Sequence, residues 1–74
     1  MDIIAGILES ATNGAKKTRI MYKAALNFRQ LQRYLPLLLK RGLMKIEETN
    51  KGTVYKTTEK GRDFLRKYEE LRRL

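Results

Sequence analysis

The chain has 74 residues, a size at which folding buries only roughly 60% of the unfolded surface, so stability depends on close packing. It contains no Cys and no His, which excludes disulfide bonds and the usual Cys/His zinc site. Its formal net charge is +9, and its 42% content of hydrophobic residues is typical of a folded chain, not a disordered one.

The first third of the chain predicts two short helices. A first helix over about residues 1–11 is indicated by apolar residues at helical spacing, and the turn residues 12–14 end it. The apolar residues of this helix are Ile3, Ile4, Ile7 and Leu8. A second helix near Lys17 to Ala24 would turn Ile20, Met21 and Ala24 towards the core.

A third helix is predicted over residues 27–41. Asn27 is suited to cap its first turn, and Gln30 stands where it can complete a capping box. Leucines 31, 35 and 38 follow at spacings that place them on one face. Gly42 is a stop signal, and it follows two cations that favour the negative end of the helix dipole.

The period of the sequence changes after Gly42. Residues 43–47 alternate apolar and polar, as a half-buried strand does, and residues 53–57 are mostly β-branched or aromatic. The turn residues 50–52 separate these runs and predict a β-hairpin. Thr58 is suited to cap a last helix over about residues 58–74, whose apolar face consists of Phe64, Tyr68 and Leu71, with Leu65 beside them.

This order of elements predicts an α+β, mostly α, winged helix-turn-helix fold in one domain over residues 1–74. It comprises a three-helix bundle, a two-stranded β-wing and a C-terminal helix. In this architecture the second and third helices and their turn form the part that enters the major groove of DNA. The fold thus predicts helix 27–41 in the groove and the wing tip, residues 49–53, at the backbone or the minor groove.

The positive charge lies in one block. Between Ser10 and Ile46 there are nine basic residues and no acidic ones, whereas the rest of the chain carries eight of each and sums to zero. The nine are Lys16, Lys17, Arg19, Lys23, Arg29, Arg33, Lys40, Arg41 and Lys45. Because like charges repel, a block of one sign in a folded segment usually faces an anionic partner, most often a phosphate backbone.

Several motifs of the chain resemble a known family. The stretch Thr18 to Ala24 is followed by Leu26-Asn27-Phe28, Tyr34-Leu35, Leu38, Gly42-Leu43 and Thr58-Glu59-Lys60-Gly61. This set, which runs over nearly the whole chain, resembles the small archaeal winged-helix DNA-binding proteins, including the "10a" type chromatin proteins and related candidate transcriptional regulators. The Thr-Arg-Ile-Met-Tyr block is its most specific part. The Thr-Glu-Lys-Gly motif is weak, since it occurs in many winged-helix families.

The resemblance implies binding of duplex DNA, often as a homodimer joined through the last helix. Phe64, Tyr68 and Leu71 are the expected dimerisation residues. Family members with a long C-terminal coiled coil continue past the position of Leu74, so the contact expected here is shorter. At most two heptads of seam are present, too few for a stable coiled coil alone, so Phe64, Leu65 and Tyr68 are expected to pack on the first helix or on a partner subunit.

The third helix carries a basic stripe opposite its leucines, formed by Arg29, Arg33, Pro36 and Lys40 and flanked by Gln30 and Gln32. Arginine can bind guanine bidentately and glutamine can do so with adenine, so Arg29 and Arg33 are the favoured base readers and Lys40 a phosphate contact. The alternative is a solvated helix face, although no carboxylate is interleaved to form intrahelical pairs.

Further cations are expected at the phosphate backbone: three at the start of the second helix, one at the wing tip and one on the return strand. A basic loop without a fixed partner and solubilising lysines remain the alternatives. The candidate DNA-binding residues are Lys16, Lys17, Arg19, Asn27, Arg29, Gln30, Gln32, Arg33, Lys40, Lys51 and Lys56. For Tyr22 and Tyr34 a place in the core is favoured over a phosphate contact.

Other classes of function are less favoured. The chain has no His, no Cys, no Gly-rich phosphate loop and no carboxylates arranged for acid–base chemistry, so we expect no enzyme, no metal and no cofactor. A protein–protein interaction module without DNA binding is the main alternative. RNA binding is less favoured, because we expect no exposed aromatic platform. No apolar run reaches the ~20 residues of a membrane span, and we expect a cytoplasmic, nucleoid-associated protein.

Overall fold

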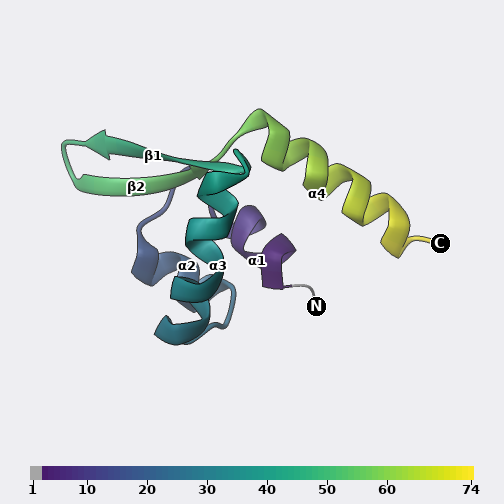
Figure 1. The fold of residues 1–74 in the computed structure, drawn as a ribbon, viewed down its shortest axis with the longest axis horizontal. Coiled ribbons are helices and arrows are strands. Elements are labelled where there is room, and N and C mark those ends of the chain that lie inside the picture. Colours follow the sequence, from purple (N-terminus) through teal and green to yellow (C-terminus); the bar gives the residue numbers. More distant parts are fainter. Residues whose placement is uncertain (1–2) are drawn as a thin grey trace.

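The computed structural model describes residues 3–74, which form four helices and a two-stranded antiparallel sheet (Figure 1). The elements in chain order are α1 (Ile3–Ser10), α2 (Lys17–Lys23), α3 (Phe28–Lys40), β1 (Met44–Thr49), β2 (Gly52–Thr57) and α4 (Glu59–Arg72). This order confirms the predicted architecture. The first two residues of the predicted first helix lie outside the described range.

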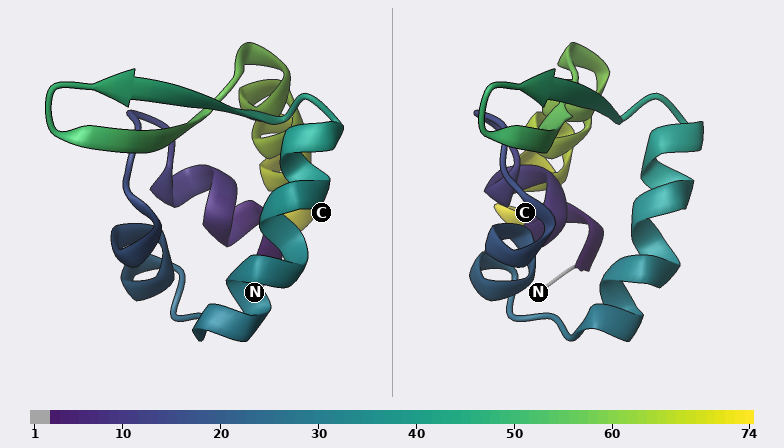
Figure 2. Two further views of the ribbon diagram at one scale, coloured as in Figure 1. Left: turned by 60° about the vertical axis from the view of Figure 1, so that its left-hand side comes forward. Right: turned by 90° about the vertical axis from the view of Figure 1, so that its left-hand side faces the viewer.

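The helices enclose one apolar core. Its members come from all parts of the three-helix bundle and from the start of the wing: Ile7, Leu8, Ala11, Ala15, Ile20, Leu31, Leu35, Leu38 and Met44. Helix α1 lies in the middle of the helical part, with α2 to one side and α3 to the other (Figure 2). The three leucines predicted to face inward from α3 are all buried, so that helix has one apolar side and one side free for another role.

The ends of α3 are determined by local sequence, as predicted. The backbone N–H of Gln30 donates to Oδ1 of Asn27 at 2.8 Å, and the N–H of Asn27 donates to Oε1 of Gln30 at 3.1 Å, which completes a capping box. The helix continues through Pro36, which lies on its exposed side, and ends at Lys40, with Arg41 as its C-cap. Gly42 follows with a φ of +75°, a conformation that glycine adopts at little cost.

The wing projects from the helical body (Figure 1). Its register pairs Met44 with Thr57 and Thr49 with Gly52. The prediction of a half-buried first strand holds only at its base, where Met44 is buried. Ile46 is 50% exposed, because the strand leaves the body before this residue and no layer covers it. Both turn residues, 50 and 51, are exposed.

The base of the wing is attached to the segment before α2. The N–H of Ala15 donates to the carbonyl of Tyr55 at 2.9 Å, and the N–H of Tyr55 donates to the carbonyl of Ala15 at 2.8 Å. This single bridge acts as one residue of a third strand. It couples the position of the wing to the start of α2, although the two are far apart in sequence.

Hydrogen bonds also hold the junction between β2 and α4. The hydroxyl of Thr57, 1% exposed, donates to the carbonyl of Leu8 at 2.6 Å. Thr58 caps α4 as predicted: its hydroxyl oxygen accepts from the N–H of Gly61 at 3.1 Å and its proton is donated to the carbonyl of Gly42 at 2.6 Å. Helix α4 therefore starts at a fixed place against α1 and the link between α3 and β1.

Helix α4 is packed at its start and free at its end. Leu65 packs against the core and α4 contacts α1, as predicted for this helix. Farther along, the helix extends away from the body (Figure 1), and Leu71 is 67% exposed. Two ion pairs, Asp63–Arg66 and Glu69–Arg72, lie along its surface.

Candidate nucleic-acid interface

The outward side of α3 carries exposed hydrogen-bond donors, and its arginines form no ion pair with an acidic residue among residues 3–74. Arg29, Gln32 and Arg33 are all exposed. Within residues 3–74 the ion pairs are Lys45–Glu47 and the two pairs along α4, so neither arginine has a carboxylate partner. Of the nine cations in the basic block, only Lys45 forms an ion pair with an acidic residue of the described part of the chain. The block therefore keeps nearly all its positive charge at the surface.

Asn27 and Gln30 have a structural role at the start of this face. Their side-chain oxygens both accept backbone hydrogen bonds in the capping box. The amide group of Gln30 keeps its N–H donors, because only its oxygen is used in the cap. Their predicted contacts with DNA stay predictions, but the cap itself orients the first turn of α3 and with it Arg29.

The start of α2 lies against the base of the wing. Lys16, Lys17 and Arg19 are exposed, and the ammonium nitrogen of Lys17 lies 5.7 Å from the centre of the Tyr55 ring, within the range of a cation–π contact. A Cβ on Gly52 would lie 3.7 Å from the ammonium nitrogen of Lys16. Cations from α2 and residues of the wing thus form one continuous surface.

Lys17 also connects this surface to α3. It lines a small depression together with Gln32 and Pro36 of the exposed side of α3 and with two of its buried leucines. The structure therefore brings Lys16, Lys17, Gln32 and the wing base together. Tyr55 belongs to this surface too and was not among the predicted residues, because its place depends on the bridge to Ala15.

The remaining predicted cations lie on the wing and at the end of α3. Lys51 is exposed in the wing turn and Lys56 is partly buried on β2. Lys40 lies in the last turn of α3, where it lines a different groove together with Arg41 and Lys60. The predicted set is consequently distributed over α2, α3 and the wing, with Lys40 at a separate groove.

Among the aromatic residues of this region, one corrects the sequence-based expectation. Tyr34 is half-buried and packs against the core, as expected, but the core prediction for Tyr22 was wrong, since this residue is 87% exposed. Helix α2 has only seven residues, and Ile20 and Met21 already occupy its inward side. Phe28, at the start of α3, is 53% exposed.

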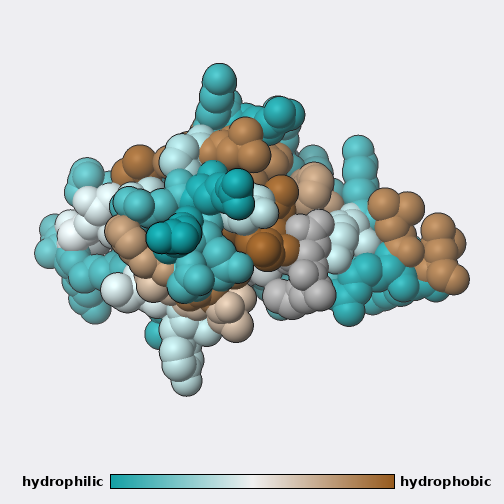
Figure 3. Space-filling view, turned by 60° about the horizontal axis from the view of Figure 1, so that its bottom comes forward, coloured by the Kyte–Doolittle hydropathy of each residue, from teal (hydrophilic) through white to brown (hydrophobic). Residues whose placement is uncertain are grey.

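The surface view agrees with this distribution. In Figure 3, which looks at the end of the molecule that carries the α2–α3 turn, hydrophilic side chains gather in the middle of the face. Apolar side chains lie beside this polar group and at the projecting end of α4. Both kinds of side chain are therefore exposed on this face.

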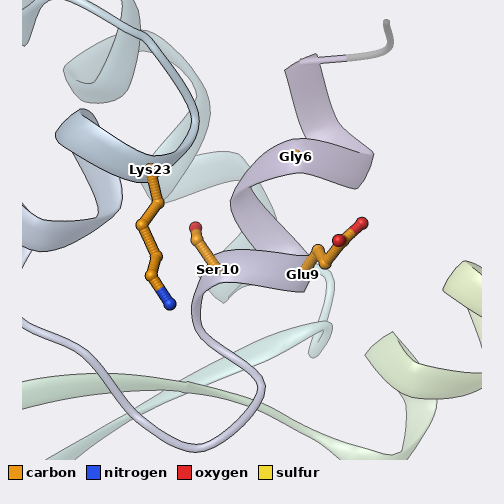
Figure 4. A pocket seen from close by; sticks show the side chains of 4 residues that line it. All are labelled: Gly6, Glu9, Ser10 and Lys23. Carbon is orange, nitrogen blue, oxygen red and sulfur yellow. The ribbon is translucent and has the colours of Figure 1, made fainter.

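A depression between α1 and α2 shows no arrangement suited to catalysis. Gly6, Glu9, Ser10 and Lys23 line it (Figure 4). The Ser10 hydroxyl donates to the carbonyl of Ile7 at 2.9 Å, and the Glu9 carboxylate points away from the Lys23 side chain. Among residues 3–74 no cluster of acidic residues could hold a metal ion, and no helix in this range has the length and apolar character to cross a membrane.

Comparisons with known proteins agree with this geometry. The winged helix-turn-helix family model matches residues 1–74. Among solved structures the chain is similar to Sso10a-2, a DNA-binding protein from Sulfolobus solfataricus, with 32% sequence identity and a TM-score of 0.85 over 96% of this chain and 75% of that chain. No curated protein matches the chain significantly. The chain thus belongs to the winged helix-turn-helix family.

Proposed function

We propose that the chain binds double-stranded DNA without catalysing a reaction, and that it places α3 in the major groove. The observation that carries this proposal is the outward side of α3, where Arg29 and Arg33 are exposed and have no carboxylate partner among residues 3–74. The similarity to a solved DNA-binding protein supports it. A helix in the major groove needs such donors on the side opposite its own core.

The proposed roles follow from position. Arg29 and Arg33 read base edges, with Gln32 beside them. The cations at the start of α2 and in the wing contact phosphates, because they lie at the side of the reading helix where the backbone would pass. These contacts comprise Lys16, Lys17 and Arg19 on or before α2, Lys40 at the end of α3, and Lys51 and Lys56 on the wing, which reaches the backbone or the minor groove.

Salt dependence tests the proposal against the alternative of a protein-binding module. If about six phosphates are neutralised, the logarithm of the association constant falls with the logarithm of salt concentration at a slope of roughly −5. Fluorescence anisotropy with a labelled duplex at several salt concentrations measures this slope. No detectable binding to duplex DNA, or a slope near zero, would contradict the proposal and favour a protein partner.

Substitutions separate base readers from phosphate contacts. Arg33→Ala should weaken binding to a preferred site by about 1–3 kcal/mol and relax sequence preference, whereas Lys17→Gln should weaken binding to all duplexes alike and lower the salt slope by about 1. Lys67 is an exposed residue of α4 that lies outside the proposed interface. Lys67→Gln removes the same charge there and should change DNA affinity and the salt slope little. Loss of affinity from both interface variants with no sequence preference would indicate a DNA-organising role, while relaxed preference would indicate a regulator.

We further propose a homodimer contact through the apolar side of α4. The apolar residues Phe64, Tyr68 and Leu71 share one side of this helix, and Leu71 is 67% exposed on the part that leaves the body. A stripe of this kind is favourable to cover in water. Leu71→Gln should therefore reduce the mass measured by sedimentation equilibrium, and Arg66→Gln should not. A monomeric parent chain at high concentration would contradict this proposal.

A further inference from the structure

A groove lies between the last turn of α3 and the first turns of α4. It has a volume of about 560 Å³. Its apolar lining includes Leu37 of α3, Leu43 of the link to β1, and Phe64 of α4. Leu37 and Phe64 are 39% and 36% exposed, so water reaches two large apolar side chains at this place. Covering such surface is favourable at roughly 25 cal/mol per Å².

Among residues 3–74, the ionisable residues that line this groove are all cations: Lys40, Arg41 and Lys60. None of the three forms an ion pair among residues 3–74. The ammonium of Lys60 donates to the carbonyl of Arg41 at 3.0 Å, which keeps that charge at the rim and leaves further N–H donors for another group. The groove therefore combines apolar walls with a positively charged rim.

We propose that this groove binds a small anionic amphiphile, with an aliphatic chain against Leu37 and Phe64 and a carboxylate at the cationic rim. The volume falls within the roughly 300–1,000 Å³ of small-molecule sites. A second copy of the chain fits less well, because the exposed leucines at the end of its α4, Leu71 and Leu74, flank Arg72 and Arg73, which the rim repels.

The ligand would also oppose DNA binding, a consequence that rests on the proposed function. Lys40 belongs to the rim and is also a proposed phosphate contact. A carboxylate bound beside Lys40 and Arg41 lowers the positive potential at this end of α3. Because binding free energies are coupled reciprocally, the ligand weakens DNA binding and DNA weakens ligand binding by the same factor.

Direct binding tests the site independently of DNA. Decanoate, kept below its micelle concentration, is titrated into the chain and followed by calorimetry and by amide shifts in NMR spectra. Leu37→Gln should weaken decanoate about tenfold, as expected for losing an apolar wall residue. Ile46→Gln is the matched control: it makes the same replacement at an exposed apolar residue on the wing and should leave affinity unchanged.

Charge is tested by the head group. Decyltrimethylammonium, with a cationic head on the same chain, should bind at least fivefold more weakly than decanoate. The double variant Lys40→Gln, Arg41→Gln should bind decanoate roughly fivefold more weakly than the parent chain, since two exposed ion pairs are lost. The proposal would be overturned if both amphiphiles bound equally, or if decanoate did not bind. It would also be overturned if Leu37→Gln and Ile46→Gln changed the affinity for decanoate to the same extent.

Two further measurements complete the test. Saturating decanoate should reduce DNA affinity several-fold in the parent chain and leave it unchanged in Leu37→Gln. If the chain binds no DNA, the calorimetric result still decides whether the groove holds the ligand, so the two proposals fail separately. A dimer that Leu37→Gln dissociates in sedimentation experiments would show that a second copy occupies the groove, and would overturn the ligand proposal.

Discussion

Gly61→Ala should destabilise the fold, although it places a better helix former in α4. A Cβ at this position would lie 2.2 Å from the carbonyl oxygen of Leu43 and 2.5 Å from Cγ2 of Thr57. Ordinary contacts of this kind need about 1 Å more, since non-bonded atoms approach each other best at about 3.5–4.0 Å. The first turn of α4 would therefore have to move away from the link between α3 and β1.

The atoms next to Gly61 cannot move without weakening hydrogen bonds. The same Leu43 carbonyl accepts a hydrogen bond from the N–H of Thr58 at 3.0 Å, and the hydroxyl of Thr58 donates to Gly42 at 2.6 Å. Overpacking costs about 1–3 kcal/mol, and weakening one of these bonds adds about 1 kcal/mol. Against this stands the usual helical gain of Ala over Gly, about 1 kcal/mol. We expect a net loss of about 2 kcal/mol.

Urea denaturation followed by far-ultraviolet circular dichroism measures this loss. For a domain of this size the melting temperature should fall by roughly 8–16 °C. Lys67→Ala, at an exposed position of the same helix, should change stability by less than about 0.5 kcal/mol. If Gly61→Ala were neutral or stabilising, the close approach of α4 to Leu43 would not exist in solution and the reasoning would be refuted.

Three further substitutions test local features by the same denaturation assay. Ala25 has a φ of +57°, which is strained for a residue with a side chain. Ala25→Gly should stabilise the chain by about 0.5 kcal/mol, because the strain that is relieved exceeds the cost of the greater conformational freedom of glycine in the unfolded chain. A loss of stability would contradict this. Asn27→Ala removes the cap that Gln30 completes and should cost about 1 kcal/mol, whereas Asn27→Asp should cost little. Thr57→Val leaves the Leu8 carbonyl without its 2.6 Å partner and should cost about 1–2 kcal/mol; Thr57→Ser, which keeps the hydroxyl, should cost less.

Local signals in the sequence were sufficient for the elements and their order. The capping box at Asn27, the glycine at 42, the cap at Thr58 and the spacing of the α3 leucines each act within a few residues, so their effect does not depend on the rest of the fold. The exposed cations of α3 follow from the same periodicity, because a helix with one apolar side presents the other side to solvent.

Contacts between distant segments were not predictable in this way. The bridge of Ala15 to Tyr55, the buried hydroxyl of Thr57 and the closeness of Gly61 to Leu43 all join residues far apart in sequence. The spacing of apolar residues along the sequence does not indicate these contacts. They place the wing beside the start of α2 and fix where α4 begins.

The sequence by itself thus determined which segments are helices and strands, and that the positive charge gathers in one block. Only the tertiary structure decided which apolar residues are covered, since Tyr22, Ile46 and Leu71 remain exposed although each belongs to a regular element. It also decided how the basic block is divided, with Lys17 beside α3 and the wing, and Lys40 at a separate groove. The physical reason is that burial depends on what packs against a surface, and a chain of this size has too few elements to cover every apolar side chain.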